Sequence, residues 1–128
     1  MNPVIRFEMP LEDHQRVVTF YSEVFGWQTQ LLGSDMGTYV LATTTRSDQH
    51  GPAKKPAING GFFQKSEDMN ARYPSVVIQV EDIHEHMRKV SNAGGEILGE
   101  PVEIPGVGWY VAFIDTEGNR VSMLQPYH

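Results

Sequence analysis

Arg6 and Glu8 are the two charged residues in an otherwise apolar N-terminal segment, Val4-Ile5-Arg6-Phe7-Glu8-Met9. Successive side chains of a strand point to opposite faces, so residues two apart share a face. A guanidinium binds anionic groups, and a neighbouring carboxylate can orient it or act as a general acid or base. The pair has two interpretations: a grip on an anionic ligand, with Glu8 as the catalytic residue of any reaction, or an ion pair that closes the floor of the fold.

The same alternation assigns faces in two other apolar segments, residues 75–80 and 120–125. In each segment the apolar residues of one parity suit a face packed on a helix, as do Ile5 and Phe7 in the first strand. The residues of the other parity, expected beside Arg6 and Glu8, are Ser75, Val77, Gln79, Ser122 and Leu124. We therefore expect polar side chains to converge on one concave face.

Other residue types that often carry chemistry form no recognisable site. His84 and His86 are only two apart on a predicted helix, so they point in different directions, and the remaining histidines are isolated. The chain has no cysteine, which excludes thiol catalysis and a disulfide framework. No Ser-His-Asp signature, P-loop or dinucleotide fingerprint is present.

Two helices and eight strands must position these residues. Acidic residues at the start and glycines at the end predict helices over 11–25 and 82–93. Apolar and alternating patterns predict strands over 4–9, 27–32, 38–43, 58–64, 75–80, 96–98, 109–114 and 120–125. The polar stretch 44–56, rich in turn-forming residues, predicts a mobile loop.

The order of these elements repeats. Asp13 and Asp82 are separated by 69 residues, and so are the helix-ending Gly26 and Gly95. The 128-residue chain therefore predicts one α+β domain, 1–128, made of two β-α-β-β-β modules at about 1–66 and 73–128.

Three sequence pieces carry a family resemblance: FYSEVFGW on the first helix, the INGGFF strand and IPGVGWYVAFIDTEGN. Together they resemble the vicinal oxygen chelate superfamily of glyoxalase I, bleomycin-resistance proteins and extradiol dioxygenases, in its small glyoxalase-like branch. The resemblance implies that two modules lie side by side and form a curved eight-stranded cup. It also implies a homodimer.

Metal-using members of this superfamily place His, Gln or Glu ligands on the first and last strand of each module. Carried onto this chain, the positions fall on Arg6, Gly61, Ser75 and Ser122. A guanidinium cannot ligate a metal, glycine has no side chain, and serine hydroxyls are poor ligands without an anionic partner. The resemblance thus predicts a cup with no metal and no cofactor.

Aromatic residues near the predicted cup have two interpretations. Tyr39 and Tyr110 occupy equivalent places in the two modules, and packing is the expected role. Phe63 and Trp109 could instead stack on a flat ligand, as the bleomycin-resistance relatives imply. The predicted ligand-binding residues are Arg6, Glu8, Phe63, Ser75, Gln79, Trp109 and Ser122.

Two functions follow from this site. The first is a protein that binds a small, anionic or aromatic molecule in its cup without a metal. The second is a lyase, isomerase or dioxygenase of glyoxalase type that uses a displaced divalent metal or acid–base chemistry by Glu8.

The charge balance argues against other partners. The net charge is −6, and no basic run exceeds Lys54-Lys55, so a nucleic-acid surface is not expected. No apolar stretch approaches the length of a membrane span or resembles a signal peptide. We therefore expect a cytoplasmic protein with no membrane partner.

Overall fold

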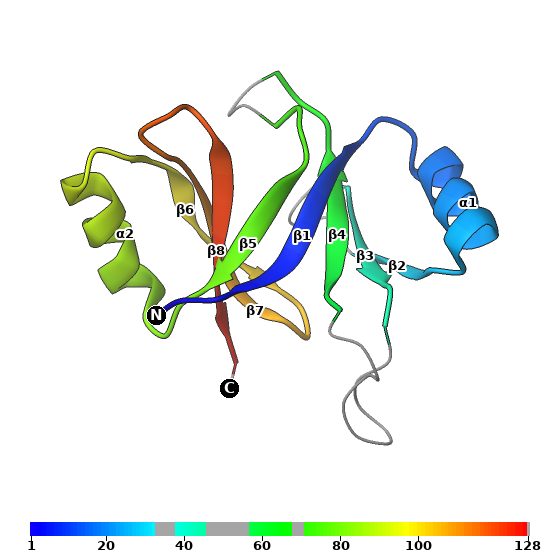
Figure 1. Ribbon diagram of the computed structural model, residues 1–128, viewed down its shortest axis with the longest axis horizontal. Helices are drawn as coiled ribbons and strands as arrows, with labels where there is room; N and C mark the ends of the chain where they lie inside the picture. The colour runs from blue at the N-terminus through cyan, green and yellow to red at the C-terminus, as the bar shows by residue number, and fades with distance from the viewer. Residues whose placement is uncertain (33–37, 46–56, 68–70, 128) are drawn as a thin grey trace.

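The computed structural model describes residues 1–32, 38–45, 57–67 and 71–127, and within them one curved sheet carries a helix at each outer side (Figure 1). The first module contains β1 (Val4–Leu11), α1 (His14–Phe25), β2 (Gln28–Leu32), β3 (Tyr39–Thr43) and β4 (Asn59–Gln64). The second contains β5 (Ser75–Gln79), α2 (Ile83–Asn92), β6 (Glu96–Ile104), β7 (Gly108–Ile114) and β8 (Arg120–Pro126). This confirms the predicted fold class of two β-α-β-β-β modules.

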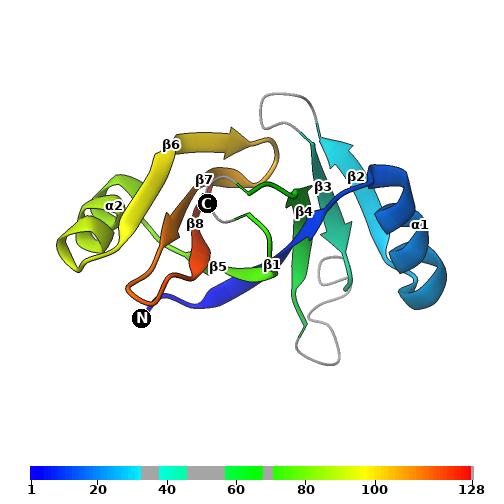
Figure 2. The same ribbon diagram turned by 90° about the horizontal axis from the view of Figure 1, so that it is seen from above.

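The two modules join through their first strands. The sheet order is β2-β3-β4-β1-β5-β8-β7-β6, with β1 antiparallel to β5 at the centre. Each first strand also pairs in parallel with the last strand of its own module, β1 with β4 and β5 with β8. Seen from above, the two ends of the sheet curl toward each other (Figure 2). We call the concave face of this sheet the cup.

Both helices begin at a capping aspartate. The Asp13 carboxylate accepts a hydrogen bond from the Arg16 amide at 3.0 Å, and Asp82 accepts one from the Glu85 amide at 3.0 Å. Helix α1 ends at Gly26, whose φ of 73° lies in the left-handed region that favours glycine. Both predicted helices are confirmed, although α1 begins at residue 14 rather than 11.

Some strand bounds differ from the sequence prediction. Strand β1 continues to Leu11 instead of ending at Met9. Strand β6 reaches Ile104 rather than residue 98, because its pairing with β7 resumes at Val102 after an irregularity. Most of the predicted mobile loop, residues 46–56, lies outside the described residues.

The alternation predicts that the side chain of Ile5 faces the helix side of β1, but it does not. The pairing of β1 with β5 shifts register between Val4 and Arg6, so Ile5 is an extra residue in a bulge. Its side chain packs with Val77 and Leu124 on the cup side. The bulge has broken the simple alternation from which the face was predicted.

Separate hydrophobic clusters lie on the two faces of the sheet. Under α1, Leu11, Val40, Ala42 and Phe62 are buried, with Phe7 packed against them. Under α2, Val80, Ile83, Val111 and Met123 form the equivalent cluster. On the cup side, Leu32 packs against clusters from both modules and so links them.

Candidate functional site: a buried carboxyl group in the cup

Glu8 lies at the centre of the cup and has no solvent exposure. The Tyr39 hydroxyl donates to its Oε2 at 3.0 Å, and the Tyr110 hydroxyl donates to its Oε1 at 2.9 Å. The Ser122 Oγ lies 3.0 Å from the same Oε1 and 2.8 Å from the Tyr110 hydroxyl oxygen. Four side chains from four strands of both modules therefore form one buried polar cluster, which we call the Glu8 cluster.

The number of protons in the Glu8 cluster indicates its charge state. The three hydroxyl groups supply three protons, but the cluster contains four hydrogen-bonded contacts. A protonated Glu8 supplies the fourth proton. Burial raises the pKa of Glu8 above its usual value, although the hydrogen bonds from Tyr110, Ser122 and Tyr39 and the charge of Arg120 oppose this shift. Burial also raises the pKa of both tyrosines. Geometry and desolvation both favour a neutral cluster.

Arg6 and Gln79 lie next to the Glu8 cluster on neighbouring strands. The Arg6 Nη2 donates to the Gly60 carbonyl at 2.8 Å, and the Arg6 side chain is only partly buried. Arg6 pairs with Val77, which packs with cup residues, and Gln79 is on the same face two residues further along β5. Arg6 does not contact Glu8 among the described hydrogen bonds and ion pairs, so the structure supports neither the ion pair at the floor nor an orienting contact from Glu8 to Arg6.

Phe63 and Ser75 also face the cup. Phe63 is buried in a cluster with Tyr39, and Ser75 pairs in register with Glu8. The Ser75 Oγ is buried and has no hydrogen-bond partner among the described residues. The Arg120 guanidinium, at the start of β8, lies 5.4 Å from the centre of the Phe63 ring. These groups join β4 of the first module to β5 and β8 of the second.

Trp109 does not belong to this site. Its neighbour Tyr110 points into the cup, so Trp109 and Val111 point to the opposite face, where Val111 packs under α2. The Trp109 side chain is 40% exposed at a depression of about 300 Å³ outside the cup. The prediction of Trp109 as a cup residue is therefore wrong. The other residues that line this depression are Ile83, His84, Glu100, Pro101 and Gln125.

Sequence reasoning missed three polar contributors to the site. Tyr39 and Tyr110 were expected to pack, and they do so through their rings, but their hydroxyls also hold Glu8. Their equivalent places in the two modules could have suggested a shared partner at the centre. Arg120 shares the parity of Ser122 in β8, so the alternation alone would have placed it in the cup.

The four family positions do not fit a metal ion. Arg6 cannot ligate, and the hydroxyl of Ser122 is engaged in the Glu8 cluster. A Cβ added at Gly61 would lie 2.5 Å from the Tyr39 hydroxyl oxygen, so the tyrosine fills the space that a ligand side chain would need. Only Ser75 remains, and one neutral hydroxyl does not bind a divalent ion. The described residues contain no group of three or more His, Cys, Asp or Glu side chains suited to a metal.

Comparison with known sequences identifies the family. Residues 4–123 match the model of the Glyoxalase/Bleomycin resistance protein/Dioxygenase superfamily. The chain therefore belongs to this superfamily. It is also 28% identical over 119 residues to a glyoxylase-like domain-containing protein of Didymella fabae, covering 88% of this chain and 84% of the relative.

Solved structures show the same fold. A Streptomyces coelicolor methylmalonyl-CoA epimerase variant in complex with 2-nitronate-propionyl-CoA has a TM-score of 0.70 at 13% identity, covering 98% of this chain and 97% of that one. The methylmalonyl-CoA epimerase from Mycobacterium tuberculosis has a TM-score of 0.67 at 13% identity, covering 98% and 88%. Identity this low extends the likeness to the fold alone. Within the described part of the chain, no helix is long and apolar enough to cross a membrane.

Proposed function

We propose that this chain binds a small anionic molecule in its cup without a divalent metal. The observation that carries the proposal is the Glu8 cluster, which occupies the centre of the cup with a carboxyl group, two phenols and a serine hydroxyl. Every donor of the cluster is directed at another member. A cation entering there would have to displace Tyr39 and compete with three hydroxyl donors.

The proposed contact for the ligand's anionic group is Arg6, with Gln79 beside it. Arg6 uses one described hydrogen bond, to the Gly60 carbonyl, and its guanidinium carries five N–H donors. Its remaining donors can bind a carboxylate or phosphate in a forked geometry. Gln79 lies diagonally across the β1–β5 pair and would supply an amide for a neighbouring polar atom of the ligand.

Phe63 would contribute an apolar wall at the other side of the Glu8 cluster. Its ring is buried, with the Arg120 guanidinium 5.4 Å from its centre, so only a small exposed part of the ring could contact a ligand. This makes Arg6 the primary anchor of the proposed site and Phe63 a secondary contact. The cytoplasmic location expected from the sequence stays part of the proposal.

The first test measures metal content and response to metal. We expect the purified protein to contain no stoichiometric Zn, Ni, Mn or Fe, and its melting temperature to stay constant when each divalent ion is added. A tightly bound ion held by Glu8, or a clear thermal stabilisation by one ion, would contradict the proposal. Such a result would favour the metal-dependent lyase, isomerase or dioxygenase instead.

The second test measures ligand binding directly. A panel of small carboxylates and phosphates, aromatic and aliphatic, is titrated by calorimetry against the wild type and Arg6→Ala. Loss of a charge-assisted hydrogen bond should weaken binding by roughly 1.5–3 kcal/mol. Arg16→Ala, which removes an exposed arginine from α1 far from the cup, is the control and should bind like the wild type. Equal binding by Arg6→Ala would exclude Arg6 as the anchor.

A further inference from the structure

The depression beside Trp109 lies outside the cup, where the start of α2 meets the last three strands of the second module. Trp109 of β7 pairs in register with Gln125 of β8 and Glu103 of β6, so these three side chains form a row on the face opposite the cup. Figure 1 shows that α2 begins at the lower end of this module, where β8 also ends. The depression measures about 300 Å³, which is the lower end of the range for small-molecule sites.

An irregularity in β6 directs Glu100 into this depression. The pairing of β6 with β7 breaks between Leu98 and Val102, and Gly99, with a φ of 91°, has a left-handed backbone conformation there. An insertion of this kind bends a strand and re-aims the side chains next to it. Glu100 lines the depression, and among the described residues no hydrogen bond or ion pair engages its carboxylate.

The start of α2 does not act as an anion site in this depression, because two of its first amides already have acceptors. The Ile83 amide donates to the Gln125 Oε1 at 2.9 Å, and the Glu85 amide donates to the Asp82 carboxylate at 3.0 Å. A helix N-terminus binds anions through free N–H groups. The hydrogen bond from Ile83 also ties the helix to β8, so the walls of the depression are held together.

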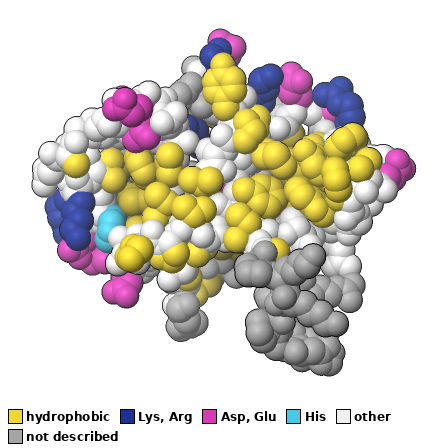
Figure 3. Space-filling view, viewed as in Figure 1, with side chains coloured by type: hydrophobic (Ala, Val, Ile, Leu, Met, Phe, Trp, Pro, Cys, Tyr) yellow, Lys and Arg dark blue, Asp and Glu magenta, His cyan; other side chains and the backbone are white. Residues whose placement is uncertain are grey.

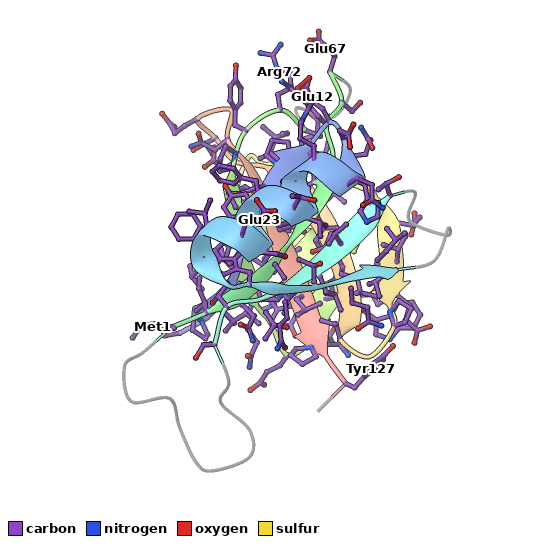
Figure 4. The ribbon with its side chains drawn as sticks, turned by 90° about the vertical axis from the view of Figure 1, so that its right-hand side faces the viewer. Met1, Glu12, Glu23, Glu67, Arg72 and Tyr127 are labelled. Carbon is purple, nitrogen blue, oxygen red and sulfur yellow. The ribbon has the colours of Figure 1, made fainter. Side chains whose placement is uncertain are left out.

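Two exposed aromatic rings belong to this side of the sheet. Trp109 and Tyr127 are each 40% exposed, and the Tyr127 hydroxyl donates to the Glu103 Oε2 at 2.6 Å. Figure 4 labels Tyr127 just beyond the end of β8. The first module has Thr38 at the position equivalent to Trp109, so the fold itself does not require a tryptophan here. The face of an exposed indole ring attracts cations.

The charge around the depression is negative. The described residues that line it include Glu100 and no lysine or arginine, and Glu103 lies next to them. Figure 3 shows acidic side chains at the lower left, where α2 begins in Figure 1, and the sequence places Glu81 and Asp82 there. Arg88 interacts electrostatically with Asp82, so those two charges offset one another. The carboxylates that remain favour a positively charged ligand.

A larger depression in the first module does not show this preference. It measures about 370 Å³ beside the start of α1, and Arg16 and Lys65 line it together with Glu12 and Asp13. Both basic side chains already lie near the Glu12 carboxylate, at 3.9 and 3.8 Å. Its charges balance, so it favours neither a cation nor an anion.

We propose that the depression beside Trp109 binds a small organic cation of the alkylammonium class. The methyl or methylene groups of the cation lie against the Trp109 indole and Pro101, and its positive charge lies beside Glu100. An aromatic face and a carboxylate together recognise such cations, because both attract positive charge while the apolar groups need no hydrogen-bond partner. The site is on the opposite face of the sheet from the cup, so it does not rest on the proposed function.

The first experiment follows the indole N–H signals of the full chain by NMR while choline is added at about pH 8, where histidine is neutral. The chain has two tryptophans, Trp27 and Trp109, and Trp109→Phe assigns their signals. The Trp109 signal should shift in a saturable way, whereas the Trp27 signal, from the cluster under α1, should stay in place. Neohexyl alcohol, the neutral isostere of choline in which carbon replaces the charged nitrogen, should shift neither signal at the same concentrations.

Substitutions then test the two sides of the site by calorimetric titration with choline. Trp109→Ala should weaken binding at least about fivefold, because the ring face is lost. Glu100→Gln should weaken binding about two- to fivefold, the range for an exposed charge. Glu96→Gln removes the same charge at the far end of β6 and should bind like the wild type, as should Arg6→Ala in the cup. Circular dichroism checks that each variant is folded.

Three outcomes overturn the proposal. They are the absence of a saturable Trp109 shift with choline, an equal shift with neohexyl alcohol, and unchanged choline binding by both Trp109→Ala and Glu100→Gln. Binding of a trimethyllysine peptide or of phosphatidylcholine vesicles, with no response to free choline, would replace the small molecule as the ligand. Equal binding of the cup ligand by the wild type and Arg6→Ala would count against the proposed function alone and would leave this site unaffected.

Discussion

Glu8 is fully buried and surrounded by hydroxyl groups, so the stability of this protein depends on whether the Glu8 carboxyl group is protonated. The pKa of Glu8 is raised by burial, so the folded protein keeps this proton at pH values where the unfolded chain has lost it. Stability from this group is fully present below the unfolded pKa and is lost as pH rises through the folded one. We expect Glu8→Gln, which stays neutral at all pH values, to remove this part of the pH dependence.

The measurement is urea unfolding of the wild type and Glu8→Gln at a series of pH values from mildly acidic upward. Inside the window above the unfolded pKa, the wild type should lose stability relative to the variant by up to about 1.4 kcal/mol per pH unit. Asp115→Asn is the control: hydrogen bonds lower the pKa of Asp115, so its pH-dependent window lies below the unfolded pKa and its offset from the wild type should stay constant across this series. Parallel wild-type and Glu8→Gln curves would mean that Glu8 is ionised in the folded state.

At the scale of elements, the adjacent glycines of β4 would be expected to weaken a strand, but the side chains that pack against β4 require them. Its adjacent glycines, Gly60 and Gly61, leave room for the Phe7 ring on one face and the Tyr39 ring on the other. A Cβ at Gly61 would lie 2.5 Å from the Tyr39 hydroxyl oxygen and 2.7 Å from the ring carbons. These glycines therefore let one aromatic side chain cover the strand on each side.

Gly61→Ala should lower the free energy of unfolding by about 1–3 kcal/mol, as overpacked cores do. The same substitution made in a Tyr39→Phe background should cost less, because the phenol oxygen nearest to the added methyl group is gone. A double-mutant cycle from urea unfolding measures this coupling. Strictly additive losses would show that Tyr39 moves aside freely and that the Glu8 cluster does not hold it in place.

The elements themselves could be predicted because their signals are local. Asp13 and Asp82 identify helix starts through their own hydrogen bonds, and Gly26 identifies a helix end through its backbone conformation. Contacts between segments that are far apart in the sequence were harder to predict. The bulge at Ile5 depends on how β5 pairs with β1, which no local pattern specifies.

The candidate site was predictable only in part for the same reason. Alternation correctly placed Glu8 and Ser122 on one face, since each needs only its own strand. Trp109 was misassigned because its neighbour Tyr110, not Trp109, has the parity of the cup. To predict that Tyr39 and Tyr110 donate to a single carboxyl group, one would have to know how both modules pack around β1.

At the scale of the whole molecule, the hydrogen bonds of the Glu8 cluster link the two modules. Tyr39 comes from the first module and Tyr110 and Ser122 from the second, while Glu8 lies on the strand that joins them. We expect Tyr110→Phe to lower the stability of both modules together, by about 1–3 kcal/mol for a buried group that loses its partner. Trp27 and Trp109 lie in different modules and report each one by fluorescence.

Coincident unfolding transitions from variants that retain only Trp27 or only Trp109 would show that the modules unfold as one unit. Separate transitions in Tyr110→Phe would show that the other contacts between modules are too weak to couple them. Thr29→Ser, an edge-strand change away from the cup, is the control and should leave both transitions in place.

The central position of β1 also has a kinetic consequence. Within this domain β1 is synthesised well before its two neighbours, which begin only at Asn59 and Ser75. Until β4 and β5 have been synthesised, its apolar residues and backbone amides have no native strand to pair with. Folding must then close long loops before the middle of the sheet can form, which places such topologies among the slower single-domain folders. During that interval a nascent chain exposes the strand on which both halves depend, and this is the period in which it is most open to aggregation or to chaperone binding.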